Sequence, residues 1–421
     1  MLTLGNGRLW RALPILCAGL LLLASGPAPA AVTQAVPARH RAAPSAADLA
    51  IQLEALLGQH SVLAADLMRS RIRGDDDFVQ AANAALGKNT SAMTTLVGQL
   101  FGQAAADKFG PMWSEHIVGL FTYAGAIAAQ DKAALEEARK ELVEYEEDLG
   151  DFFAGASQGR LSRAAARAAV VQHVGHLTGQ ADAYAAKNYA LADDLYRMGY
   201  QHTYDLGLTL AKSLLPAKDV ATLGQPLWRL RSQLGKLLAE HAALVEDLTR
   251  AAVTGSPDFD SSGQMINGNT ADLAAAMDTL FGPAAAKQFQ SLWADHVEQL
   301  VAYSSATAAA DKAKQDQART EMAGIEQRMG TFLAGATSKH ISAADLTAAV
   351  QKHDMMLMKH ADAYAAKDYA TAHDVAYDTY QDMFGLATQL ADAFGVTVAA
   401  RLPRGGAQTG YGGMAAVVES R

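Results

Sequence analysis

The stretch PMWSEHIVGLFTYAGAI, residues 111–127, recurs later in the chain as SLWADHVEQLVAYSSAT, residues 291–307. Its Trp, His and Tyr all return 180 positions later, Trp113 as Trp293 for example. Further matches lie on both sides, such as FGQAAADKF with FGPAAAKQF and FFAGAS with FLAGAT. A constant offset over such a length indicates an internal repeat. The sequence therefore predicts two copies of one structural module.

Both copies have the composition and periodicity of helices. Ala, Leu and Gln are abundant, while long runs of Val, Ile and Thr are scarce. Apolar residues recur at three- and four-residue spacing, as in Leu53, Leu56, Leu57, Leu63 and Leu67. We therefore expect an all-α fold of two tandem homologous helical bundles that follow a signal peptide.

Composition also predicts where the parts of the chain begin and end. The segment LPAKDVATLGQP contains two prolines and a glycine and is expected to be a linker, and the segment after Val396 has no apolar face. A Gly-, Ser- and Asp-rich stretch near residues 254–269 is expected to be a loop. The expected divisions are a signal peptide at 1–30, a flexible leader at 31–45, repeat 1 at 46–214, the linker at 215–226, repeat 2 at 227–396 and a disordered tail at 397–421.

The N-terminus has the pattern of a secretory signal. Arg8 and Arg11 precede an apolar run over residues 13–24, and the small residues GPAPAA follow. The run is too short for a comfortable membrane span, so no stable membrane insertion is expected. We expect cleavage near Ala30 and a periplasmic or secreted protein. Cys17 is the only cysteine and would be removed with the signal, which leaves the mature chain without a thiolate ligand.

The net charge excludes one large class of partners. The chain of 421 residues carries a formal net charge of −9, so it has no general excess of cations to bind phosphates, and nucleic acid is not expected as a partner. It contains no Walker loop and no dinucleotide fingerprint after a strand, and neither a nucleotide nor a flavin cofactor is expected. No feature of the sequence identifies a protein partner.

Histidines recur on the apolar faces of the expected helices. Four helices of the first copy each carry one, and the second copy keeps three of them and an aspartate. A single buried imidazole is usually a core residue bonded to a carbonyl or carboxylate, but four on separate helices could share one metal ion. Both interpretations remain open at this stage. The candidate ligands are His60, His116, His173 and His202 in the first copy, and His241, His296, His353 and Asp382 in the second.

A second cluster lies on one expected helix of each copy. His173 and His176 are three residues apart, and His353, Met356 and His360 lie three and four apart on one helical face. Imidazole and thioether together suit copper, and a chain without cysteine would have to use them. Methionine also fills gaps in helical cores, so packing alone is the alternative explanation.

The spacing of ligand residues excludes several better-known metal sites. No glutamate is followed by histidine three residues later, which excludes the paired motif of carboxylate-bridged di-iron bundles. Neither His-x-x-x-His nor His-x-x-x-Glu occurs, which excludes the zinc protease motif. No catalytic residues are predicted.

The unit Trp-x-x-His-x-x-x-x-x-x-Tyr, followed by Ala-Asp-Ala-Tyr-Ala-Ala-Lys-x-Tyr, resembles tandem helical modules of exported bacterial proteins that are loosely named copper amine oxidase-like. The resemblance covers most of both copies and implies exported helical modules. It does not imply oxidase chemistry, because true copper amine oxidases make their quinone from the tyrosine of Asn-Tyr-Asp/Glu. Here the only Asn-Tyr pair is Asn188-Tyr189, which Ala190 follows.

The sequence thus favours an exported helical protein that binds a transition metal through core-facing histidines, with copper preferred over zinc or iron. Storage, buffering or carriage of the ion is the expected role, and an enzyme is less favoured. Two alternatives remain: a helical protein-protein interaction module whose histidines are structural, and a metal-dependent enzyme of unknown substrate.

Overall fold

The computed structural model describes residues 45–401, and helices joined by short connections make up that range. Thirteen helices and no strand occur among these residues, which confirms the prediction of an all-α fold. The expected signal peptide, all of the expected leader except Ser45 and the tail from residue 402 onward lie outside the described residues.

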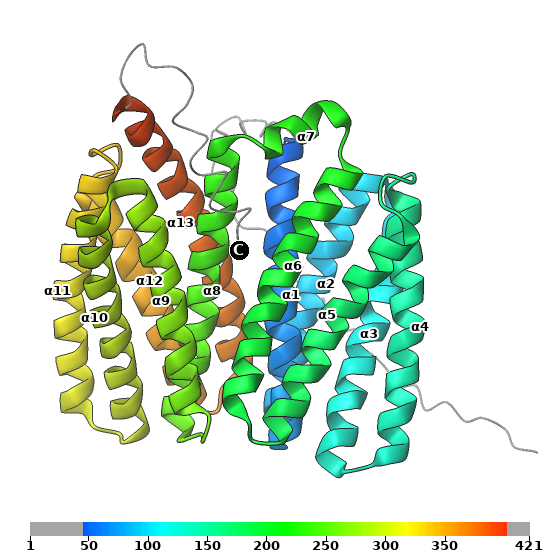
Figure 1. The fold of residues 1–421 in the computed structure, drawn as a ribbon. Coiled ribbons are helices and arrows are strands. Elements are labelled where there is room, and N and C mark those ends of the chain that lie inside the picture. Colours follow the sequence, from blue (N-terminus) through cyan, green and yellow to red (C-terminus); the bar gives the residue numbers. More distant parts are fainter. Residues whose placement is uncertain (1–44, 402–421) are drawn as a thin grey trace, which may run out of the picture. The chain divides into compact units, whose positions relative to one another are not determined.

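Six long helices form each repeat, and one short helix joins the repeats (Figure 1). The first repeat contains α1 (Ala46–Arg73), α2 (Asp76–Phe101), α3 (Gln103–Ala129), α4 (Lys132–Ala156), α5 (Arg163–Ala185) and α6 (Tyr189–Leu214). The connection is α7 (Ala217–Leu223). The second repeat contains α8 (Pro226–Thr254), α9 (Phe259–Phe281), α10 (Pro283–Ala308), α11 (Lys312–Ala336), α12 (Ala343–Ala365) and α13 (Tyr369–Arg401).

Helix is more extensive than the sequence predicts at three places. The expected linker contains α7, the expected loop near residues 254–269 is helical from Phe259 onward, and α13 continues five residues beyond Val396. In the last case Thr397 is buried, and its hydroxyl donates to the carbonyl of Ala393 one turn earlier. A packed residue at this position explains why the helix does not end where the apolar pattern weakens.

The same residue types begin the helices of both copies. Asp131 caps α4 and Asp311 caps α11 through bonds from backbone N–H groups of the first turn, as expected for aspartate at such positions. Ser162 and Ser342 cap α5 and α12 in the same way. These side chains accept hydrogen bonds from amide groups that a helix leaves unpaired at its start. The positions at which these helices begin are therefore encoded locally.

The turns of the two copies share even their unusual backbone conformations. In the Ala-Ala-Lys turns that precede α6 and α13, Lys187 has a φ of 60° and Lys367 a φ of 59°. Left-handed conformations are uncommon for residues other than glycine. Their recurrence at equivalent positions shows that the two copies share one backbone plan.

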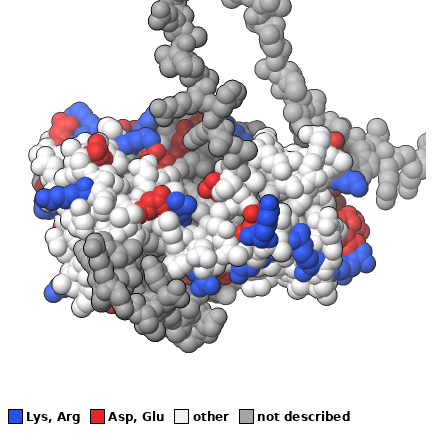
Figure 2. Space-filling model, turned by 90° about the horizontal axis from the view of Figure 1, so that it is seen from above, with Lys and Arg blue, Asp and Glu red and all other residues white. Residues whose placement is uncertain are grey.

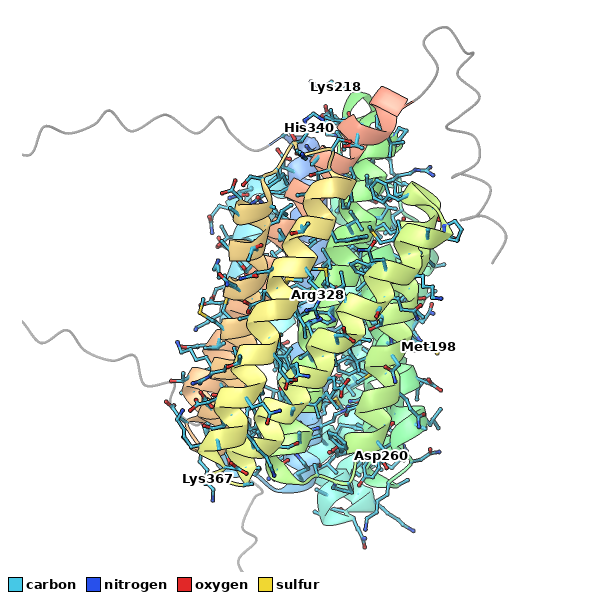
Figure 3. All side chains as sticks on the ribbon, turned by 90° about the vertical axis from the view of Figure 1, so that its left-hand side faces the viewer. Met198, Lys218, Asp260, Arg328, His340 and Lys367 are labelled. Atoms are coloured by element: carbon cyan, nitrogen blue, oxygen red, sulfur yellow. The ribbon has the colours of Figure 1, made fainter. Side chains whose placement is uncertain are left out.

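Helices α1 and α8 lie between the others (Figure 1). Within its repeat α1 contacts α2, α3, α5 and α6, and α8 contacts the equivalent helices α9, α10, α12 and α13. Successive helices run in opposite directions. In Figure 3, His340 and Lys367, in the turns before and after α12, lie at opposite ends of the bundle. Helix α12 therefore spans the bundle, and the short turns at its ends send α11 and α13 in the other direction.

The two repeats pack against each other around an approximate twofold axis. Helix α2 contacts α13, the equivalent helix α9 contacts α6, and α1 contacts α8. Near the axis, Tyr200 and its counterpart Tyr380 place their hydroxyl oxygens 3.0 Å apart. One cluster of buried apolar residues includes members of both repeats, such as Leu63 and Leu244. The interface between the repeats is therefore part of the hydrophobic core.

Buried charges also cross this interface. The Arg69 guanidinium lies 2.9 Å from Asp193 of its own repeat and 3.7 Å from Asp247 of the other. Its counterpart Arg250 donates to Asp247 and, at 2.8 Å, to Asp258. Arg69 is 1% exposed. Separation of the repeats would remove the interaction of Arg69 with Asp247 and leave buried charges with fewer partners. The independent folding of each repeat therefore stays a prediction.

The surface carries both signs of charge. On the face shown in Figure 2, Lys and Arg side chains lie interspersed with Asp and Glu. Among residues 45–401, no helix combines the length and hydropathy that a membrane span requires.

A first prediction concerns the close approach of α4 and α5. A methyl group on Gly150 would lie 2.9 Å from the backbone Cα of Arg167, whereas one on Gly155 of the same helix would meet nothing within 4 Å. We expect Gly150→Ala to lower the free energy of unfolding by about 1–3 kcal/mol because the helices must separate. Gly155→Ala should be neutral or stabilising by up to about 1 kcal/mol. Urea unfolding of both variants measures the difference, and equal stabilities would contradict this packing.

A second prediction concerns the buried charges. Replacing Arg69 by methionine leaves Asp193 without its ionic partner in the core and removes part of the positive charge beside Asp247. Loss of one member of a buried ion pair costs about 3–5 kcal/mol, so Arg69→Met should lower the free energy of unfolding by that amount. Lys140→Met is the control, because Lys140 pairs with Glu137 at the exposed surface, where such pairs contribute at most about 1 kcal/mol. A similar small effect of both substitutions would show that Arg69 is not buried with these carboxylates.

Candidate metal centres

Three histidines of the first repeat meet in its interior. His60 comes from the middle of α1, His116 from α3 and His173 from α5, and each is at most 3% exposed. The Nε2 atoms of His60 and His116 lie 3.0 Å apart. One ring nitrogen from each of the three residues lies within 4.8 Å of the others. We call this group the first triad.

The second repeat builds the same group from the equivalent helices. His241 of α8, His296 of α10 and His353 of α12 are each at most 2% exposed. The Nε2 atoms of His241 and His296 lie 3.2 Å apart, and one ring nitrogen from each residue again lies within 4.8 Å of the others. This group is the second triad.

Two members of the second triad belong to a chain of hydrogen bonds that begins and ends at one tryptophan. The Trp293 indole N–H donates to Nδ1 of His241 at 3.1 Å, and the Trp293 carbonyl accepts from Nδ1 of His296 at 2.7 Å. With both imidazoles neutral, these bonds leave one proton for the gap between the two Nε2 atoms, and it belongs to His241. His241 therefore donates through Nε2 to His296.

The first triad differs at the tryptophan. His116 Nδ1 contacts the Trp113 carbonyl, as in the second repeat. Within the described residues, however, neither the Trp113 indole N–H nor Nδ1 of His60 has a hydrogen-bond partner. His60 is therefore free of the constraint that Trp293 places on His241.

The third histidine of each triad is the least satisfied. Among the residues that the structure describes, both ring nitrogens of His173 and both of His353 lack a hydrogen-bond partner. Leaving a buried polar group unpaired costs about 1–3 kcal/mol. Buried polar atoms without a partner at equivalent places in two repeats call for a common explanation, such as an ion or a bound molecule.

All six imidazoles are held in the neutral form. Burial lowers the pKa of His116 and His353 to about 3 and that of His296 to about 4. Burial, together with the neighbouring histidines, also lowers the pKa values of His60, His173 and His241 well below their usual range. Neutral imidazole is the form that binds metals, so near neutral pH protons do not compete by charging these rings.

The spacing of the nitrogens is close to that of a metal site. Two imidazole nitrogens at about 2.0–2.1 Å from a tetrahedral ion lie about 3.4 Å apart. The observed separations of 3.0 and 3.2 Å are slightly shorter than this value. Each triad could therefore hold a transition-metal ion once its third imidazole moves inward.

The fourth ligand expected from α6 and α13 lies elsewhere. Nε2 of His202 is 2.8 Å from the Ala169 carbonyl, and Asp382 pairs with Lys352 at the surface. The next residue along each helix faces inward instead. Thr203 is fully buried, and its counterpart Met383 is 1% exposed. The apolar pattern that places His202 on the core face also includes Met198, which is 54% exposed and lies at the side of the bundle in Figure 3.

The other candidate ligands are spread over separate places. His176 packs on His202, with ring centroids 5.5 Å apart, beside a groove open to solvent. Met356 is half-buried on α12. His360 is buried near the interface between the repeats, where it packs on Tyr364. The triads thus contain six of the eleven residues proposed from the sequence, namely His60, His116, His173, His241, His296 and His353.

Several residues near the triads are not among the candidates that the sequence predicts. The Tyr145 ring stacks on His116, with centroids 4.5 Å apart and an interplanar angle of 10°. A cavity of about 40 Å³ adjoins the second triad, and His296 and His353 form part of its wall. Methionines also line this cavity, and they are Met277, Met329 and Met383. They come from three different helices, so spacing along the chain could not associate them.

Comparison of the chain with models of protein families, with curated proteins and with solved structures found no match. The interpretation of the triads therefore depends on their own geometry. The resemblance to modules named copper amine oxidase-like stays a prediction.

A third prediction uses the lowered pKa of His353. In the unfolded chain histidine has a pKa of about 6.5, whereas burial lowers the pKa of His353 to about 3 in the folded protein. Between these values the unfolded chain binds one more proton. The contribution to stability is therefore complete above about pH 6.5 and decreases as the pH falls toward about 3. Below about pH 6.5 we expect the stability of His353→Leu to fall less steeply than that of the wild type, by about 1.4 kcal/mol for each pH unit.

Urea unfolding of the two proteins over this pH range measures the difference in slope. The comparison is needed because other groups act in the opposite direction. Burial raises the pKa of Glu54 to about 8, for example, so its contribution to stability increases as the pH falls through that value. Such contributions are common to both proteins and cancel. Parallel curves would contradict the burial of a neutral His353.

Proposed function

We propose that each histidine triad binds one transition-metal ion, with copper(I) favoured, and that the protein is exported and stores, buffers or carries the metal. The main support is the convergence of three buried, neutral imidazoles in each repeat, one of which leaves both ring nitrogens without partners. One ion could satisfy three such groups at once.

The charge of the site favours a singly charged ion. Each triad consists of neutral ligands only, so the charge of the bound ion is not cancelled by its ligands. The cost of burying a charge rises with its square, and a +1 ion costs about a quarter as much as a +2 ion of the same size in the same surroundings. Imidazole and thioether also suit copper(I), and three methionines line the cavity beside the second triad.

The hydrogen bond from Trp293 affects binding at the second triad. The proton on His241 Nε2 points toward His296, into the space that an ion would occupy. The ion would displace this proton, because metal ligands bind through a free lone pair. A proton moved to Nδ1 of His241 would then face the Trp293 N–H. In the first triad the Trp113 N–H and Nδ1 of His60 are not hydrogen-bonded to each other. We therefore expect weaker metal binding at the second triad than at the first.

One observation favours a second candidate, in which the histidines are purely structural. The bonds among Trp293, His241 and His296 satisfy most of the polar atoms of these residues without any ion. This candidate leaves His353 unexplained, since both of its ring nitrogens lack partners within the described chain. Metal binding is the better supported function because an ion would bind one nitrogen of each of the three residues, His353 included.

Storage or carriage is favoured over turnover of an organic substrate. The cavity beside the second triad measures about 40 Å³, while sites for drug-sized ligands measure about 300–1,000 Å³. Export is supported by the order of charged, apolar and small residues at the N-terminus. N-terminal sequencing of secreted protein should find the mature chain beginning near Ala31, and retention of Met1 would refute export by cleavage.

A fourth prediction tests the triads as metal sites. After loading with copper(I) under reducing conditions and removal of excess ion, elemental analysis should find two ions per chain in the wild type. His116→Ala and His296→Ala should each retain one ion, and the double variant none. Competition with a copper(I) chelator should show tighter binding in His296→Ala, which keeps the first triad, than in His116→Ala.

His202→Ala is the matched control, because His202 lies on the next helix of the same repeat and bonds to a backbone carbonyl. It should retain both ions. Helix content measured by circular dichroism must be that of the wild type in every variant. Full copper binding by a folded double variant would refute the proposal.

A further inference from the structure

The two triads differ in what covers them. In the first repeat, the flat face of Tyr145 stacks on His116 at a centroid distance of 4.5 Å. The equivalent residue of the second repeat, 180 positions later, is Ile325. Isoleucine has no ring to cover His296, and here the structure has a cavity of about 40 Å³ that is lined by Ile325, His296 and His353. The exchange of an aromatic ring for a branched aliphatic side chain thus gives the second triad a space beside it.

The wall of this cavity is suited to a ligand that makes few hydrogen bonds. Apart from its two imidazoles, it consists of aliphatic, aromatic and thioether side chains, including Met277, Met329 and Met383. The Trp293 indole N–H, which also belongs to a lining residue, already donates to His241. Among the lining residues only His353 keeps ring nitrogens without a partner. A single imidazole does not supply the two to four polar partners that a buried water usually needs. In the metal-free protein, charged ligands are disfavoured for the stronger reason that no charged side chain lines the cavity.

The size of the cavity limits the ligand further. A cavity needs roughly 10–15 Å³ for each water-sized unit, so a volume of about 40 Å³ admits a molecule of up to about three or four non-hydrogen atoms. The diatomic gases, such as dioxygen, carbon monoxide and nitric oxide, are neutral, weakly polar molecules that fit within this limit.

We propose that the cavity of the second triad binds a neutral diatomic gas next to His296 and His353. The cavity binds the gas by shape and apolar contact whether or not a metal is present. Coordination of the gas to copper(I) is a further step that rests on the proposed function. The first triad, which Tyr145 covers, binds no gas. The two repeats would then differ in role, with one closed centre and one centre open to a small molecule.

Xenon tests the cavity without any metal, because it is apolar and binds to dry cavities in proteins. We expect a crystal of the metal-free protein under xenon pressure to show one xenon atom between Ile325 and His353. Ile325→Tyr should abolish this site because its ring can stack on His296 as Tyr145 does on His116. The reverse substitution, Tyr145→Ile, should create a second xenon site at the first triad. Ile325→Phe serves if the tyrosine variant does not fold, since a phenyl ring fills the same space.

Carbon monoxide tests the metal-dependent step. Infrared spectra of the copper(I)-loaded wild type should show a single bound C–O band with one equivalent of carbon monoxide per chain, and Ile325→Tyr should lose it. Absence of xenon from the wild-type cavity, or equal xenon binding by Ile325→Tyr or Ile325→Phe, would overturn the gas site. If the wild type binds xenon but retains no copper after loading with copper(I), the proposed function is refuted and the gas site stands.

Discussion

The burial of α1 and α8 is the constraint on which the histidine triads and the buried ion pairs depend. Each lies among the other helices of its repeat and also against the other central helix, so its polar side chains must find partners within the protein. On α1 they occur at three levels. Glu54 has a pKa raised by burial to about 8, His60 meets two other imidazoles, and Arg69 meets carboxylates of both repeats. Proton uptake, imidazole clustering and ion pairing are thus three solutions to one problem.

Much of the fold could be predicted because its causes are local. Apolar spacing predicts the helices, and aspartate or serine at their starts predicts several boundaries, as at Asp131 and Asp311. The meeting of His60, His116 and His173 could also be anticipated, since each lies on an apolar stripe at a similar depth of its helix. The fourth ligand could not be chosen correctly. A change of one residue on a helix turns a side chain by about 100°, so the difference between His202 and Thr203 depends on how α6 is rotated against its neighbours.

The features that the sequence does not reveal depend on contacts between distant segments. The ion pairs of Arg69 are not local, and they exist because Asp193 and Asp247 are brought to it by α6 and by the other repeat. The cavity beside His353 likewise depends on several helices at once. Comparison of the two copies would have pointed to position 145, since a tyrosine of one repeat is an isoleucine in the other. The consequence of that difference requires the packed structure.

The contact between Tyr200 and Tyr380 has an implication for the origin of the chain. Residues equivalent by the repeat meet each other at the approximate axis, with their hydroxyl oxygens 3.0 Å apart. This is the geometry of an isologous interface, in which one surface patch contacts its own copy. The chain is thus built like a homodimer whose subunits have been joined. Two identical subunits must change together at every position, whereas a fused pair can change one half alone. In a joined pair the surroundings of one triad can therefore change, as at Tyr145 and Ile325, without the same change in the other.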